Sequence, residues 1–290
     1  MREAVSIVGL GRVGTALAVA LKERGCILKS LADKDLGALE RARLLLGGDI
    51  SVSSSMEDVG PAEVFLITVR DDAIFQVASF LRSRFPRALL VHTSGLHSSH
   101  ILGEGPRLAM HPLQSFASVR EALENLPASL FSLEGDARGL EWGRKVVESL
   151  GGHSMELEAS QKPLYHLAAC IASNYLITLL HEALRAMEEA GMERERVLPG
   201  LIALMRGTLR NADGLGVPQA LTGPMVRGDV GTIESHLRAL EGREGMKEFY
   251  LYMARKTLEM IRGGGLPTPR SSLEAMETLI RKESSRSGGR

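Results

Sequence analysis

The sequence predicts an α/β fold in which a doubly wound, Rossmann-type parallel sheet precedes an all-α domain. A glycine motif stands between a strand and a helix close to the first residue. Strand and helix patterns then alternate through the first half, whereas nearly every pattern after Gly151-Gly152 is helical. We expect the first domain over 1–155, the helical domain over 156–285 and a disordered tail over 286–290.

The glycine motif follows an apolar run and reads Gly9-x-Gly11-x-x-Gly14. Gly9 lets the chain turn sharply, Gly11 lets a pyrophosphate approach the backbone, and Gly14 lets the helix pack closely on the sheet. The pyrophosphate would lie at the helix N-terminus, where free N–H groups favour an anion. The motif predicts a domain that binds NAD or NADP, with Arg12 and Val13 inside the binding loop. The alternative is a glycine-rich turn of another α/β fold.

Asp33 ends a second strand over 26–32, about 20 residues beyond the last glycine, where an acid binds the adenosine ribose. A carboxylate there favours NAD. The neighbouring cation Lys34, together with Arg12, would attract the 2′-phosphate of NADP. The choice of cofactor stays open, with a slight preference for NADP.

Further strands are expected over 64–69, 88–92 and 130–133. Asp71 or Asp72 can cap a helix that Pro86 stops, and another helix is expected over 140–150. Because right-handed crossovers make these strands parallel, their carboxyl ends meet at one edge. That edge would carry three segments, namely Val69 with Arg70, Ser94 with Gly95, and the polar, proline-fixed segment at His111.

The second half predicts a long helix from about 160 to 191, followed by helices near 194–212, 229–241, 245–262 and 271–283. The long helix is apolar on several faces, so its own domain or a second subunit must cover it. We expect a homodimer through these helices.

The start of the long helix carries the candidate catalytic residues. Lys162 and His166 lie one turn apart on one face, and Asn174 follows two turns later. Imidazole titrates near neutrality and suits proton transfer. The alternative is a solvated helix start, which the amide inside an apolar stretch argues against.

Arg227 lies in the turn before Asp229 and could clamp a substrate carboxylate with its fork of donors, or form a structural pair with Asp229.

Four histidines could suggest a metal site, but their spacing matches no usual zinc pattern, and we expect no metal site. They are His92, His97, His100 and His111.

The composition is that of an ordinary globular chain of 290 residues, with 35 basic and 35 acidic side chains and 44% hydrophobic residues. Zero net charge argues against a nucleic-acid or membrane partner.

Cys26 and Cys170 stand in apolar stretches and fit buried thiols rather than a disulfide. A strand begins within four residues and no uninterrupted apolar run reaches about 18 residues, so we expect no signal peptide, no membrane span and a cytoplasmic location.

Several stretches together resemble a family of oxidoreductases in which a Rossmann-like domain precedes a helical domain of unknown function. That second domain is similar to the C-terminal domains of 6-phosphogluconate dehydrogenase-like enzymes. The resemblance rests on the glycine motif and on these segments: 69–74, His92-Thr93-Ser94-Gly95-Leu96, 111–116, Tyr165-His166 with Ser173-Asn174-Tyr175, and 221–224 with Arg227-Gly228-Asp229.

The resemblance implies a dimeric NAD(P)-dependent reductase of a small 2-oxo or imino acid, with ketopantoate and pyrroline-5-carboxylate among the substrates of relatives. From the residues themselves we expect His166 to donate the proton, with Lys162 as the alternative donor. Lys162 and Asn174 would polarise or orient the reacting group, and Arg227 would bind the carboxylate. The chain departs from the related β-hydroxyacid dehydrogenases, which place Asn four residues after the Lys, where His166 stands here. Arg70 also replaces a frequent proline. The alternative function is an NAD(P)-binding sensor or scaffold without turnover.

Overall fold

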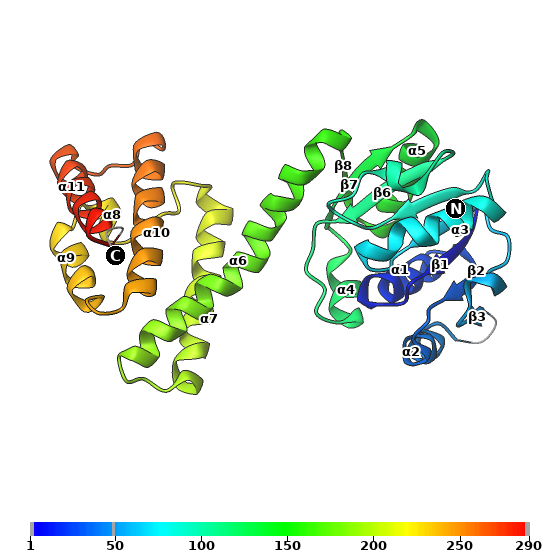
Figure 1. The fold of residues 1–290 in the computed structure, drawn as a ribbon, viewed down its shortest axis with the longest axis horizontal. Coiled ribbons are helices and arrows are strands. Elements are labelled where there is room, and N and C mark those ends of the chain that lie inside the picture. The colour runs from blue at the N-terminus through cyan, green and yellow to red at the C-terminus, as the bar shows by residue number, and fades with distance from the viewer. Residues whose placement is uncertain (1–2, 48–49, 288–290) are drawn as a thin grey trace. The chain divides into compact units, whose positions relative to one another are not determined.

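The computed structural model describes residues 3–47 and 50–287 (Figure 1). The chain forms two compact units that meet between Tyr175 and Leu176. This division lies later than the boundary expected at 155/156. The reason is that the first turns of the long helix α6 (Lys162–Glu189) pack with the N-terminal unit, where Lys162 and Tyr165 both form hydrogen bonds.

The N-terminal unit is built on an eight-stranded sheet of order β3-β2-β1-β4-β5-β6-β7-β8. Its strands are β1 (Ala4–Val8), β2 (Ile27–Ala32), β3 (Ser51–Ser53), β4 (Val64–Ile67), β5 (Leu89–His92), β6 (Arg107–Pro112), β7 (Leu130–Gly135) and β8 (His153–Glu156). The first six strands are parallel. β7 pairs antiparallel with β6 and parallel with β8, so the last two strands run opposite to the rest.

Helices cover both faces of this sheet, which confirms the doubly wound Rossmann architecture. Alternate residues of β4 separate the two cores: Leu66 packs with one, and Phe65 and Ile67 with the other. One core takes residues from α1 (Arg12–Glu23), α2 (Leu36–Leu46), α4 (Val119–Asn125) and α5 (Ala137–Leu150), whereas α3 (Ile74–Arg84) belongs to the other.

Three strands were not expected from the sequence. β3 has three residues, and every residue of β8 is exposed, so neither shows an apolar run. β6 includes His111 and Pro112, which the sequence placed in a polar, proline-fixed segment.

The C-terminal unit is helical, as expected. It contains α7 (Arg194–Leu215), α8 (Pro224–Arg227), α9 (Val230–Ala239), α10 (Glu244–Gly263) and α11 (Arg270–Ser287). The last four of these helices share a core that includes Ile233, Leu258 and Met276. The expected disordered tail is wrong for Arg286 and Ser287, because α11 continues through them and the Arg286 guanidinium pairs with Glu283 at 2.7 Å. Residues 288–290 lie outside the described residues.

The long helix α6 is much more exposed than its sequence suggests. Together with the turn before it, over Ala159–Glu189, it is long and apolar enough by length and composition to cross a membrane, although no uninterrupted apolar run marks it. Only 6% of that apolar window is buried within the chain. Cys170 on this helix is half-buried rather than buried, whereas Cys26 is buried as expected.

Candidate active site

The glycine loop after β1 distinguishes two packing glycines from one open one. Gly9 has a φ of +98°, and a Cβ there would lie 2.7 Å from the Thr68 carbonyl carbon. A Cβ on Gly14 would lie 2.0 Å from the Gly9 oxygen. A Cβ on Gly11 would meet no atom within 4 Å. Gly9 and Gly14 therefore bring the chain together, and Gly11 leaves its backbone open to a ligand.

The N-terminus of α1 fits an anion. Its N-cap is Gly11, which supplies no capping side chain, and the first turn holds no acidic residue. Arg12 adds an exposed cation, whose Nη1 lies 3.4 Å from the Phe116 oxygen, whereas Val13 packs against the core. The N–H groups of this turn and the helix dipole favour a phosphate.

Asp33 lies beside the glycine loop, where the sequence predicted it. Its Oδ2 accepts a 2.5 Å hydrogen bond from the Leu10 N–H, and its Oδ1 accepts one of 2.9 Å from Asp35. The carboxylate therefore fixes the loop. Lys34 beside it is exposed.

The segment after β4 lies at the same edge of the sheet. Val69 packs partly into the core, whereas the Arg70 side chain is 88% exposed and pairs with Asp72 at 3.2 Å. Arg70 thus faces solvent and is held by its own neighbour. Asp71 and Asp72 do not cap α3 as expected, because its N-cap is Ala73 without a side-chain hydrogen bond.

Asp71 instead holds the loop after β5, a role that the sequence analysis missed. The buried Ser94 hydroxyl donates to Asp71 Oδ2 at 2.8 Å and accepts from the N–H groups of Leu96 and His97, each at 3.2 Å. The Ser94 N–H donates to His92 Nδ1 at 3.1 Å. The signal available in the sequence was an acid directly after a buried strand, at the edge where ligands bind.

His111 on β6 faces Tyr165 and His166 of α6. Its Nδ1 lies 2.8 Å from the Tyr165 hydroxyl oxygen, and its ring centroid lies 6.4 Å from that of His166. Burial, assisted by the charges of Lys162 and His166, lowers the pKa of His111 to about 4. His111 is therefore neutral at physiological pH and serves as a hydrogen-bonding group.

Lys162 and His166 reach the same loop from α6. Lys162 is 1% exposed, and its Nζ donates to the backbone carbonyl oxygen of Ser94 at 3.4 Å. Burial lowers the pKa of its ammonium. His166 is half-buried, and a Cβ on Gly95 would lie 2.8 Å from its Cδ2. Its Nδ1 lies 3.9 Å from the Cys170 sulfur. The cluster therefore presents an amine and two imidazoles around Gly95.

Two predicted catalytic residues are not part of this cluster. Asn174 lies on an exposed part of α6, eight residues after His166 and so about 12 Å further along the helix axis. The prediction that the Asn174 amide is buried is therefore wrong. Arg227 ends α8 in the C-terminal unit, and Asp229 beside it caps α9 by accepting from the Thr232 N–H at 3.1 Å.

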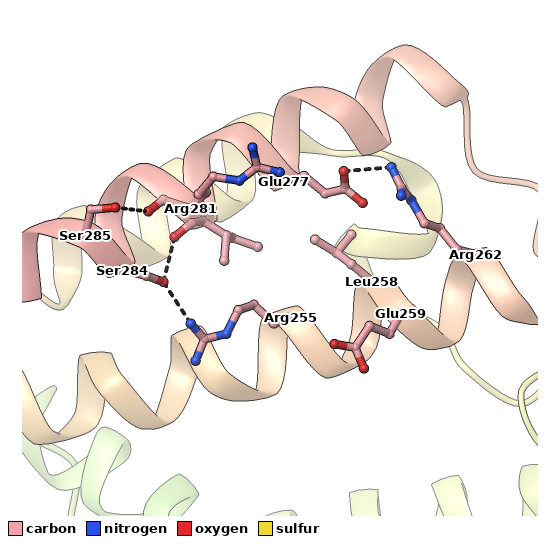
Figure 2. A pocket seen from close by; sticks show the side chains of 9 residues that line it. Arg255, Leu258, Glu259, Arg262, Glu277, Arg281, Ser284 and Ser285 are labelled. Atoms are coloured by element: carbon pink, nitrogen blue, oxygen red, sulfur yellow. Dashed lines mark hydrogen bonds and ion pairs between the residues drawn. The ribbon is translucent and has the colours of Figure 1, made fainter. Parts of the chain in front are cut away.

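The C-terminal unit also holds a groove of about 440 Å³ between α10 and α11 (Figure 2). Its polar groups engage one another: Arg262 pairs with Glu277 at 2.7 Å, and Arg255 donates to Ser284 at 3.3 Å. It includes none of the residues predicted from the sequence. Within residues 3–47 and 50–287, no three His, Cys, Asp or Glu side chains gather as metal ligands.

The sheet and its helices define a protein of the Rossmann-fold class with a helical C-terminal unit. Within that class, the chain belongs to the family of protein TM1727 from Thermotoga maritima. The two are 31% identical, 82% of this chain and 90% of that chain are covered, and the TM-score is 0.68. Residues 129–257 match the domain of unknown function DUF2520, which here begins just before β7 and extends into α10.

Two more distant structures share the fold. BF3122 from Bacteroides fragilis, titled a candidate NADP oxidoreductase, is 20% identical over 88% of this chain and 97% of its own, with a TM-score of 0.71. Pyrroline carboxylate reductase from Plasmodium falciparum, solved with NADP bound, is 14% identical over 98% of this chain and 97% of its own, with a TM-score of 0.57. No curated protein sequence matches this chain.

Proposed function

We propose that this protein is an NAD(P)-dependent oxidoreductase that reduces a small 2-oxo or imino acid, with a ketopantoate-like acid as the candidate substrate. One observation supports this most strongly. The open backbone at Gly11 and the cluster of Lys162, His111 and His166 belong to the same carboxyl edge of the sheet. This is the edge at which α/β proteins bind dinucleotides.

The residues of the glycine loop fit a dinucleotide. A pyrophosphate would lie over Gly11 at the uncapped N-terminus of α1, and Asp33 would face the adenosine ribose. Ser94 and Gly95 would lie beside the nicotinamide. They follow β5, which only β4 separates from β1 in the sheet. A bound nicotinamide cofactor supplies the hydride for the reaction.

The residues of α6 and β6 would supply the proton and orient the substrate. Reduction of a C=O or C=N bond adds a hydride to carbon and a proton to oxygen or nitrogen. His166 is half-buried at the loop and would donate that proton, regaining it from solvent. Lys162 would polarise the reacting oxygen or nitrogen through its remaining N–H groups. His111 is neutral and would orient the substrate together with Tyr165.

The substrate carboxylate would be bound by a guanidinium, for which Arg227 is our candidate. Asn174 would contribute an amide to the same substrate. These two assignments rest on the sequence pattern and on the chemistry of their side chains.

The decisive experiment measures NADPH and NADH oxidation with a panel of 2-oxo and cyclic imino acids. Turnover of at least one acid, lost in a Lys162→Met, His166→Asn double variant, supports the proposal. Tight cofactor binding without turnover of any acid in the panel would instead favour an NAD(P)-binding sensor.

We also propose that a second copy of this chain covers the exposed apolar side chains of α6 and α7. These include Leu164, Ile171, Ile177, Leu204 and Leu209, whose exposed fractions run from 54% to 73%. Apolar area of this kind marks an interaction surface. Polar residues interrupt α6, and its first residue, Lys162, is buried and donates to Ser94 of the N-terminal unit, which favours a protein partner over a membrane. Light scattering should give the mass of a dimer, and Ile171→Glu should give the monomer; a monomeric wild-type chain that binds lipid vesicles would contradict this.

A further inference from the structure

Two oppositely charged side chains are buried beneath the loop that carries Ser94 and Gly95. Lys162 on α6 is 1% exposed, and Glu134 on β7 is 7% exposed. Charged residues are almost never buried this completely unless an opposite charge or a set of hydrogen bonds compensates them. The proposed reaction gives Lys162 a task but gives Glu134 none.

The two charges hold opposite ends of one loop. Lys162 Nζ donates to the Ser94 oxygen at 3.4 Å. Five residues later, Glu134 accepts from the Ser99 N–H at 2.6 Å and from the Ser99 hydroxyl at 2.7 Å. The segment between them includes Gly95, against which His166 and His111 pack.

We propose that Glu134 is a positioning residue of the active site: it offsets the buried ammonium of Lys162 and anchors the far end of the loop that presents Ser94 and Gly95. This inference rests on the proposed function for its catalytic meaning. Its structural part, the coupling between Glu134 and Lys162, does not depend on any cofactor or substrate.

The charged groups around Lys162 support Glu134 as its main counter-charge. Burial lowers the pKa of Lys162, and the negative charges of Glu134 and then Asp71 oppose that effect. The Asp71 side chain is 51% exposed, so water screens its charge, whereas Glu134 is buried. Two buried histidines near Lys162, namely His92 and His111, add no positive charge at neutral pH. Burial lowers the pKa of His92 to about 3 and that of His111 to about 4.

A double-mutant cycle in the full-length protein tests the coupling. Glu134→Gln removes the charge and keeps one acceptor oxygen for the Ser99 N–H, while its new NH2 group can donate to the Ser99 hydroxyl oxygen. At pH 7 it should raise the unfolding equilibrium constant on the order of tenfold, because it leaves a buried ammonium uncompensated. In a Lys162→Met background the same change should alter that constant by no more than about twofold. If Glu134→Gln alone does not fold, the double variant should.

The pH dependence separates charge compensation from simple packing. The stability lost in Glu134→Gln should return as pH rises, because Lys162 then loses its proton, whereas Ser99→Ala should lose stability without that pH dependence. Equal losses in both Lys162 backgrounds would overturn the proposal.

For turnover, Glu134→Gln should move the kcat–pH profile with little change in KM. A chain that turns over no acid but still shows the coupling contradicts the proposed function and leaves the Glu134–Lys162 pairing supported.

Discussion

Gly95 and His166 lie in such close contact that no side chain fits between them. A Cβ built on Gly95 would come within 2.8 Å of His166 Cδ2 and within 3.0 Å of His111 Nε2. The glycine, at the end of the β5 segment, therefore lets two imidazoles from α6 and β6 converge on one point. The contact joins residues that are far apart in the sequence, and it follows from the packing of the first turns of α6 on the N-terminal unit.

We predict that Gly95→Ala displaces His166 and lowers kcat/KM on the order of 100-fold, the cost typical of a misplacement of about 1 Å. Cofactor affinity should change little, because the glycine loop is untouched. Steady-state kinetics with fluorescence titration of NADPH would check both. Full activity in Gly95→Ala would show that His166 does not need its present position.

Gly11→Val should abolish cofactor binding in a folded protein. The new side chain meets no protein atom, since a Cβ at this position has nothing within 4 Å, but it fills the space that a pyrophosphate needs. Gly14→Val is the matched control: its Cβ would lie 2.0 Å from the Gly9 oxygen, so this variant should unfold instead. Circular dichroism and NADPH titration distinguish the two outcomes, and undiminished binding in Gly11→Val would contradict the dinucleotide site.

Cofactor choice should lean towards NADP. Lys34 and Arg12 are exposed cations near the ribose position, while both oxygens of Asp33 accept backbone N–H groups. Lys34→Ala should weaken NADPH binding and leave NADH binding nearly unchanged, as isothermal titration would show. A preference for NADH beyond about 100-fold, or about 2.7 kcal/mol, would prove this prediction wrong.

The proton donor can be identified by comparing two variants. If His166 gives the proton, His166→Asn should lower kcat by about 10²–10⁴-fold. Lys162→Met should lower kcat by less, because it leaves the proton donor in place. Full activity of the His166 variant beside an inactive Lys162 variant would assign the proton to the lysine instead.

Acid should destabilise the folded protein through its buried histidines. The pKa of His111 is about 4 when folded, against an ordinary value of 6.5. Between these values the unfolded chain binds more protons, so stability is full above about pH 6.5 and falls as pH drops towards 4. The loss for this one residue is roughly 3 kcal/mol at 1.36 kcal/mol per pH unit. His111→Gln should flatten the slope of denaturant-derived stability against pH over this range; an unchanged slope would contradict the lowered pKa.

The features that local sequence patterns control were predictable without the structure. Gly-x-Gly-x-x-Gly between a strand and a helix, the apolar run of β4 and the helical spacing after Ser160 predicted the Rossmann sheet and the helical second half. These follow from backbone geometry and side-chain periodicity, which act over a few residues. The same patterns could not find β3 and β8, because short or polar strands are specified by the neighbours with which they pair. The strand β6 escaped because its apolar run of Leu108, Ala109 and Met110 is only three residues long and leads into His111 and Pro112.

Which chemical groups meet depends on contacts that form only in the folded chain. Asp71 was expected to cap a helix, yet it holds Ser94, because β4 and β5 are neighbours in the sheet and both end at its ligand-binding edge. Lys162 was expected to share a helix face with His166 as a catalytic group, and the fold buries it; Glu134, which has no motif to mark it, is buried as well. Burial and the opposition of charges depend on contacts across long sequence separations, so the sequence supplies the candidate groups and the fold selects among them.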